Sequence, residues 1–136
     1  MPTALSHVSI VVPDLEAAAR HLERKFGLAV GPRALNAEQG VRLAYVDLPG
    51  AKIELMEPSR PDSPVAKFLE RNPKGGIHHF CLGVDDVEKA VHGLTQGGVR
   101  ILGDGKPHHN IAGERIAFIH PGDFLGALVE LEEHKA

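Results

Sequence analysis

The sequence predicts an α+β fold made of two tandem βαβββ modules. The main observation is an internal repeat, in which HVSIVVPDLEAAARHL at residues 7–22 matches HFCLGVDDVEKAVHGL at residues 79–94 at a constant offset of 72. A second pair of matching segments follows at an offset of 76, with IELMEP at residues 53–58 and VELEE at residues 129–133. Two pairs of matching segments that occur in the same order in both halves of the chain indicate a duplicated unit.

The first module is expected to cover about residues 4–58 and to open with a Val- and Ile-rich strand at residues 7–12. A helix should follow, because Asp14 is a suitable N-cap and apolar residues then recur at helical spacing until Gly27. Three further strands are expected at residues 29–32, 41–48 and 52–56.

The second module, at about residues 76–133, repeats this order. Its helix is expected to have Asp85 as N-cap, with Glu88 completing a pair that is similar to a capping box, and to end at Gly97. The strands after this helix are expected at residues 100–102, 115–119 and 127–131.

A short helical linker is expected between the modules at residues 62–74. Ser63 can cap this helix, Pro64 suits its first position, and Pro73 with the following glycines ends it. The two modules and the linker are expected to form a single domain over residues 1–136.

Composition excludes several classes of protein. The chain has 136 residues, 24% of them charged, and a formal net charge of −3 with no Trp and one Tyr, which argues against a nucleic-acid partner. No apolar run reaches the roughly 20 residues of a membrane helix. Cys81 is the single cysteine, which excludes a disulfide scaffold. Together with a start that lacks the features of a signal peptide, it predicts a cytoplasmic protein.

Two histidines and two glutamates occupy equivalent positions in the repeat: His7 pairs with His79, and Glu54 with Glu130. Any one of them alone could lie on a solvated face. Both glutamates, however, lie between aliphatic residues, where a buried carboxylate needs a cation or hydrogen bonds. If a pseudo-two-fold axis relates the modules, the four side chains can converge on one divalent ion such as Co, Ni, Mn, Zn or Fe(II).

The repeat and this ligand pattern resemble the vicinal-oxygen-chelate superfamily, whose glyoxalase-like incomplete barrel surrounds a metal site. Within it, the sequence is most similar to the methylmalonyl-CoA epimerase family, through the segments HVSIVVPDLEAA, EQGV, IELMEP, DSPVAKFLERN, GGIHHFCLGVDD, AFIHP and ALVELEE. The resemblance implies that His7, Glu54, His79 and Glu130 hold the metal, with His79 rather than His78 as the ligand of the HH pair. It favours cobalt.

The resemblance also implies an isomerase that interconverts the C2 epimers of methylmalonyl-CoA by 1,1-proton transfer through a metal-stabilised enolate. Glu130 is expected to move one proton, and Glu54 is its symmetric counterpart or only a ligand. A cytoplasmic homodimer that binds an acyl-CoA thioester is implied as well. The alternatives are a glyoxalase I-like lactoylglutathione lyase and a non-catalytic drug-binding protein of the same fold.

The sequence departs from the family pattern in three places. Some epimerases carry a glutamate acid/base where this chain has Leu43, which leaves bound water, Glu54 or Glu38 as the second proton carrier. The family's glycine-rich loop reads KPHHNIAGE at residues 106–114, and the lysine that often follows His-Pro is Gly122. Candidates for contacts with the coenzyme A phosphates are then His108, His109, Lys67, Arg71 and Lys74.

Overall fold

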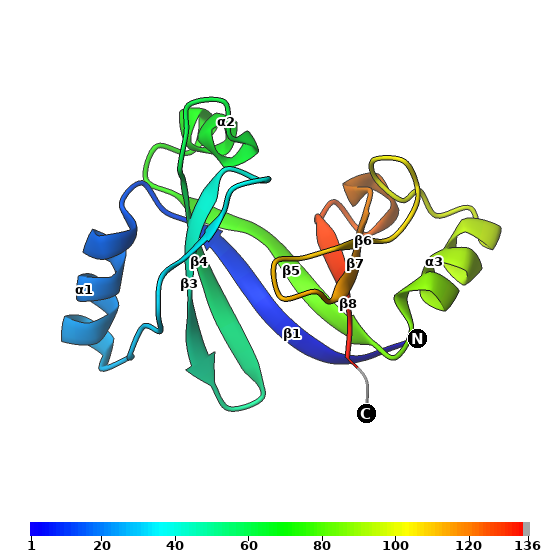
Figure 1. Ribbon diagram of the computed structural model, residues 1–136, viewed down its shortest axis with the longest axis horizontal. Helices are drawn as coiled ribbons and strands as arrows, with labels where there is room; N and C mark the ends of the chain where they lie inside the picture. Colours follow the sequence, from blue (N-terminus) through cyan, green and yellow to red (C-terminus); the bar gives the residue numbers. More distant parts are fainter. Residues whose placement is uncertain (135–136) are drawn as a thin grey trace. The chain divides into compact units, whose positions relative to one another are not determined.

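A computed structural model describes residues 1–134 and shows the βαβββ order twice, with one helix between the two copies (Figure 1). The elements are β1 (Pro2–Val11), α1 (Leu15–Phe26), β2 (Ala34–Asn36), β3 (Val41–Leu48), β4 (Ala51–Pro58), α2 (Pro64–Arg71), β5 (Gly76–Val84), α3 (Val87–Gln96), β6 (His108–His109), β7 (Arg115–Ile119), a 3-10 turn (Pro121–Asp123) and β8 (Val129–Glu133). Among the described helices, none has the length and apolar character needed to cross a membrane.

The chain packs as two compact units. The first unit is His7–His78, and the second unit combines Met1–Ser6 with the residues from His79 onward. Strands β1 and β5 therefore contribute residues to both units. The expectation of one domain over residues 1–136, with modules at 4–58 and 76–133 and a linker at 62–74, stays a prediction.

In the first unit the strands lie in the order β2-β3-β4-β1, with β1 parallel to β4 and the other pairs antiparallel. Side chains alternate between the two faces of a strand. Apolar residues occupy successive positions of these strands, so both faces of the sheet are apolar. One surface packs on α1 through the cluster of Leu15, Ala44, Val46 and Leu55. The other packs on α2 through the cluster of Val11, Val41, Leu43, Met56 and Val65.

The second unit repeats this arrangement. Its strands lie in the order β5-β8-β7-β6, with β5 parallel to β8 and the remaining pairs antiparallel. Helix α3 packs on one face of this sheet through a cluster of Val84, Val87, Val91, Ala117, Ile119, Val129 and Leu131. The repeat in the sequence is therefore a repeat in the structure.

Three predicted strands are wrong in position. No strand forms at residues 29–32, where Pro32 has no N–H to give to a ladder, and β2 lies at Ala34–Asn36 instead. Residues 100–102 form only an isolated bridge between Ile101 and Ile119, and β6 is the two-residue His108–His109. The last strand begins at Val129 rather than residue 127, because residues 121–127 form turns.

The helix ends agree with the sequence except at one cap. Asp14 accepts a hydrogen bond from the Ala17 amide, Ser63 caps α2, and Gly27 closes α1 with a φ of 66°. In the second unit the N-cap is Asp86 rather than Asp85: its side chain accepts from the Lys89 amide at 3.0 Å. Two adjacent aspartates both satisfy the capping rule, but the repeat offset of 72 aligns Asp86 with Asp14, the N-cap of α1.

In each unit, the strand that pairs in parallel with the first strand carries a glutamate near its end, and this glutamate binds the helix of the same unit. Glu57 of β4 accepts a hydrogen bond from the Leu15 amide of α1 at 2.6 Å, and Glu133 of β8 accepts one from the Val87 amide of α3 at 3.1 Å. Both amides are at the first helical position, where no intrahelical acceptor exists. The duplicated fold thus carries a duplicated helix cap supplied by the sheet.

We expect Glu57→Ala to lower the free energy of unfolding by about 1 kcal/mol, because it leaves the amide of the buried Leu15 without its acceptor. Urea unfolding of the metal-free protein measures this change. The control is Glu70→Ala, at an exposed glutamate of α2, which should shift stability by less than about 0.5 kcal/mol. Equal effects of the two substitutions would contradict the capping role.

Candidate metal and active site

The first unit brings His7 and Glu54 together, as the repeat predicts for its first copy. His7 lies on β1 and Glu54 on the neighbouring parallel strand β4, where Ser9 and Glu54 are in register. His7 Nε2 is 3.8 Å from Glu54 Oε1, and both side chains are buried. A buried imidazole and a buried carboxylate therefore face each other on the sheet.

Two hydroxyl groups hold the Glu54 carboxylate. The Ser9 hydroxyl donates to Oε1, and the Tyr45 hydroxyl donates to Oε2 at 2.9 Å. The Tyr45 ring also meets the His7 ring edge to face, with 6.0 Å between centroids. These hydrogen bonds offset part of the cost of burying the carboxylate.

The second unit brings His79 and Glu130 together in the same way. His79 Nε2 is 3.2 Å from Glu130 Oε1, and both residues are buried. The ring of Phe118 on β7 packs edge to face against His79 at 5.4 Å between centroids. Cys81 on β5 is fully buried and in register with Glu130.

The surroundings of the two glutamates correspond position by position. The antiparallel neighbour in register with each glutamate is aromatic, Tyr45 in the first unit and Phe118 in the second. The parallel neighbour in register is small, Ser9 in the first unit and Cys81 in the second. Ser9 and Cys81 are equivalent at the repeat offset of 72. The sequence analysis does not identify Tyr45, and the available signal is its position as the single tyrosine, two residues after Leu43.

Each pair has the donor chemistry and spacing of metal ligands. Imidazole nitrogens and carboxylate oxygens bind divalent ions at about 2.1 Å, so two ligands of one ion lie about 3 to 4 Å apart. The distances of 3.8 Å for His7 and Glu54 and 3.2 Å for His79 and Glu130 fall in this range. Within its own unit, each pair could therefore fill two coordination positions of a divalent ion.

The other candidates for proton transfer lie elsewhere. Leu43, at the place of a family acid/base, belongs to the apolar cluster with Val11 and Met56. Glu38 is exposed in the turn before β3, where its carbonyl accepts from Arg60. His78 is half-buried, and its ring packs on Phe68 of α2.

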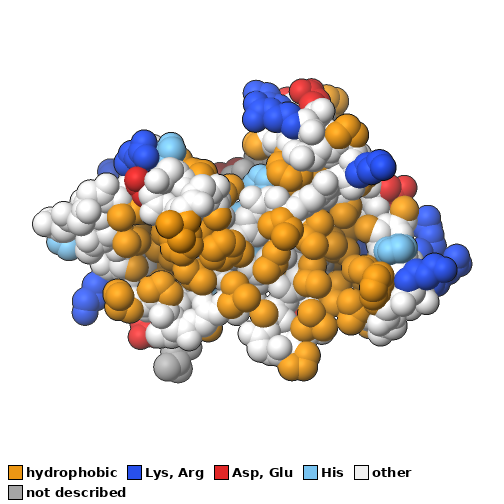
Figure 2. Space-filling model, turned by 180° about the vertical axis from the view of Figure 1, so that it is seen from behind, with side chains coloured by type: hydrophobic (Ala, Val, Ile, Leu, Met, Phe, Trp, Pro, Cys, Tyr) orange, Lys and Arg blue, Asp and Glu red, His pale blue; other side chains and the backbone are white. Residues whose placement is uncertain are grey.

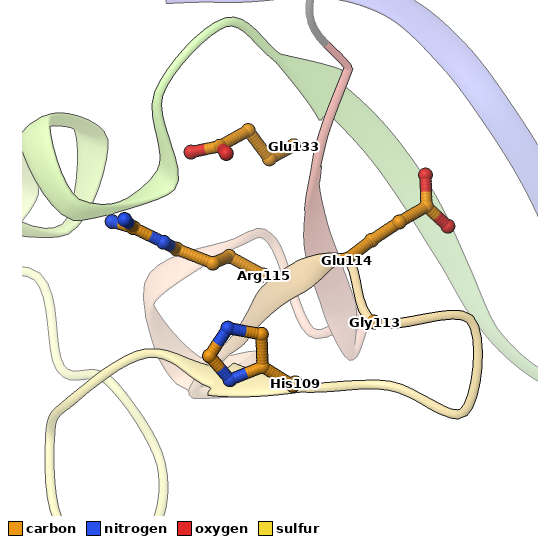
Figure 3. A pocket seen from close by; sticks show the side chains of 5 residues that line it. All are labelled: His109, Gly113, Glu114, Arg115 and Glu133. Carbon is orange, nitrogen blue, oxygen red and sulfur yellow. The ribbon is translucent and has the colours of Figure 1, made fainter.

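The altered loop at residues 106–114 is exposed for most of its length. His108 is bonded to Asp104 at 2.8 Å, and His109 lines a shallow pocket of about 390 Å³ with Gly113, Glu114, Arg115 and Glu133. Figure 3 shows the Glu114 carboxylate turned away from the side chains of Arg115 and Glu133. The cations of the linker region, Lys67, Arg71 and Lys74, are exposed.

Gly122 leaves room for an arginine. A Cβ atom at this position would lie 2.8 Å from Nη2 of Arg100. Arg100 is exposed and pairs with Asp123 at 2.9 Å, and this guanidinium lowers the pKa of Asp123 to about 2. A cation thus lies beside the position where the family often has a lysine.

The chain is similar in sequence to proteins of a known family. Residues 6–118 match the Glyoxalase/Bleomycin resistance protein/Dioxygenase superfamily. The chain is 46% identical over 129 residues to the ethylmalonyl-CoA/methylmalonyl-CoA epimerase of Cereibacter sphaeroides, which covers 95% of this chain and 96% of that protein. The chain belongs to the methylmalonyl-CoA epimerase family. The predicted resemblance and the predicted α+β, glyoxalase-like fold class are confirmed.

Solved structures of this epimerase family have the same fold. A substituted Streptomyces coelicolor methylmalonyl-CoA epimerase in complex with 2-nitronate-propionyl-CoA matches with a TM-score of 0.89 at 35% identity, covering 100% of both chains. A methylmalonyl-CoA epimerase in complex with methylmalonyl-CoA and NH4+ matches with a TM-score of 0.89 at 35% identity, covering 100% of this chain and 97% of that chain. The family's fold thus extends over the whole length of this chain.

Cys81 is expected to be chemically inert in the native protein. Burial, and then the charges of Glu130 and Glu132, raise the pKa of its thiol, so the reactive thiolate is scarce at pH 8. A chromogenic disulfide reagent should modify it at least about 100-fold more slowly in the native protein than in concentrated guanidinium chloride. Stoichiometric modification of the native protein within seconds would contradict the observed burial.

Proposed function

We propose that this chain is a metal-dependent isomerase that interconverts the C2 epimers of methylmalonyl-CoA by 1,1-proton transfer. The observation that carries the proposal is the buried pair of histidine and glutamate repeated in both units. Membership of the methylmalonyl-CoA epimerase family supports the substrate and the reaction type. No feature of the described residues favours the lactoylglutathione lyase or the drug-binding alternative over this reaction.

His7, Glu54, His79 and Glu130 are the residues that we assign to one divalent ion. Support comes from their equivalence in the repeat, from their burial, and from the donor spacing within each pair. Two imidazoles and two carboxylates suit Co, Ni, Mn, Zn or Fe(II), and we favour cobalt. When bound, such an ion supplies Lewis-acid stabilisation of the negative charge that develops on the thioester oxygen.

Proton transfer at C2 needs one group on each face of the substrate carbon. We assign Glu130 to the removal of the C2 proton, which leaves an enolate whose charge is shared with the thioester oxygen. Return of a proton to the opposite face inverts the centre. Glu54 is the counterpart that we assign to this second transfer, since Leu43 has no titratable group and Glu38 is exposed on a turn.

Glu130→Ala is expected to lower deuterium entry at C2 of methylmalonyl-CoA in D2O by about 10²- to 10⁴-fold, because the proton acceptor is removed. Mass spectrometry of the thioester, with cobalt-loaded protein and with excess chelator, measures the exchange. Glu70→Ala, at an exposed glutamate of α2, is the matched control and should exchange as the wild type does. Wild-type protein that shows no metal-dependent exchange above background would overturn the epimerase proposal.

The acyl-CoA substrate needs cationic contacts for its phosphates. Lys67, Arg71 and Lys74 lie exposed on α2 and in the turn that follows it, and His108 and His109 lie exposed on β6. We assign the phosphate contacts to residues among these. We also place the protein in the cytoplasm, because its one cysteine is buried and unpaired, as suits a reducing compartment.

We also propose a homodimer. Apolar side chains gather on the surface of each unit (Figure 2), and the large exposed ones include Phe26, Leu35 and Ile77 in the first unit and Ile111 and Leu125 in the second. Such patches are typical of protein interfaces. Light scattering during size-exclusion chromatography is expected to give about twice the chain mass of 14.6 kDa. A mass of one chain at micromolar concentration would exclude a stable dimer.

A further inference from the structure

The two pairs of histidine and glutamate differ in the groups that surround the glutamate. In the first unit, both carboxylate oxygens of Glu54 accept a hydroxyl hydrogen bond, one from Ser9 and one from Tyr45. In the second unit, the positions equivalent to those two hydroxyls are a thiol, Cys81, and a phenyl ring, Phe118. A thiol is a weak donor and a phenyl ring donates no hydrogen bond.

Tyr45 is itself held in place. Its backbone pairs with Glu54 in the ladder between β3 and β4, and its ring contacts the ring of His7 edge to face. On the exposed side, Lys52 Nζ lies 5.5 Å from the ring centroid. The strand pairing and the contact with His7 therefore limit the rotation of the side chain that presents the hydroxyl to Glu54.

The two carboxylate oxygens of Glu54 have different neighbours. Oε2 is engaged by the Tyr45 hydroxyl at 2.9 Å, while Oε1 is the oxygen that lies 3.8 Å from His7 Nε2. With Oε2 anchored, the carboxylate plane is set and Oε1 points to the same side as the histidine nitrogen. Substitution of a group that orients a metal ligand in this way typically lowers metal affinity 10- to 100-fold.

We infer that Tyr45, together with Ser9, is a positioning residue that fixes Glu54 as a metal ligand beside His7. This inference rests on the proposed metal site. In this role the tyrosine acts through Glu54. In the second unit the equivalent positions hold Cys81 and Phe118 instead of hydroxyl-bearing side chains.

The test compares Tyr45→Phe and Ser9→Cys with the wild type by cobalt titration of the metal-free protein against a chromogenic chelator. Both substitutions keep the shape of the side chain, and Ser9→Cys installs the residue found in the second unit. We expect cobalt affinity to fall about 10- to 100-fold in each variant, with a changed visible spectrum of the bound cobalt. Lys52→Ala removes a contact to the same ring but leaves the hydroxyl, so it should bind cobalt as the wild type does.

Glu54→Ala separates the failure of this inference from the failure of the metal site. If Glu54→Ala weakens cobalt binding while Tyr45→Phe and Ser9→Cys bind as the wild type does, the positioning role is wrong and the site stands. If Glu54→Ala also binds as the wild type does, the assigned site is wrong. Thermal unfolding of the metal-free variants identifies a purely structural role, in which the melting temperature falls and cobalt affinity and spectrum do not change.

Discussion

The burial of the Glu54 and Glu130 carboxylates, one in each unit, is the constraint on which this structure depends. Glu54 and Glu130 lie in β4 and β8 among side chains of the core, where an isolated charge would be very costly. Each has a histidine nitrogen within 3.8 Å, and Glu54 has two hydroxyl donors besides. A cation bound at the proposed site would complete this compensation.

Duplication gives the same backbone to two sites that have since diverged. In each unit a parallel strand pair aligns the glutamate with a small residue, and an antiparallel neighbour aligns it with an aromatic ring. The side chains at these positions are Ser9 and Tyr45 in one unit and Cys81 and Phe118 in the other. One scaffold thus places two glutamates in different environments.

Sequence patterns were most reliable where one local interaction decides the structure. The caps at Asp14 and Ser63 and the end of α1 at Gly27 depend on the few residues around them, and the structure confirms them. The expected strands at residues 29–32 and 100–102 are wrong because ladder partners come from distant segments. The short β6 was missed for the same reason, since two exposed histidines carry no strand pattern.

The sequence by itself determined the repeat and the family, because these follow from residue identity and spacing, and it predicted the four residues that we assign to the metal. Only the tertiary structure decided which side chains surround them. Tyr45 reaches Glu54 because β3 and β4 pair in one particular register, and Leu43 is part of the core because its face of β3 packs under α2. Register is set by the packing of the whole sheet, and no short segment of the sequence encodes it.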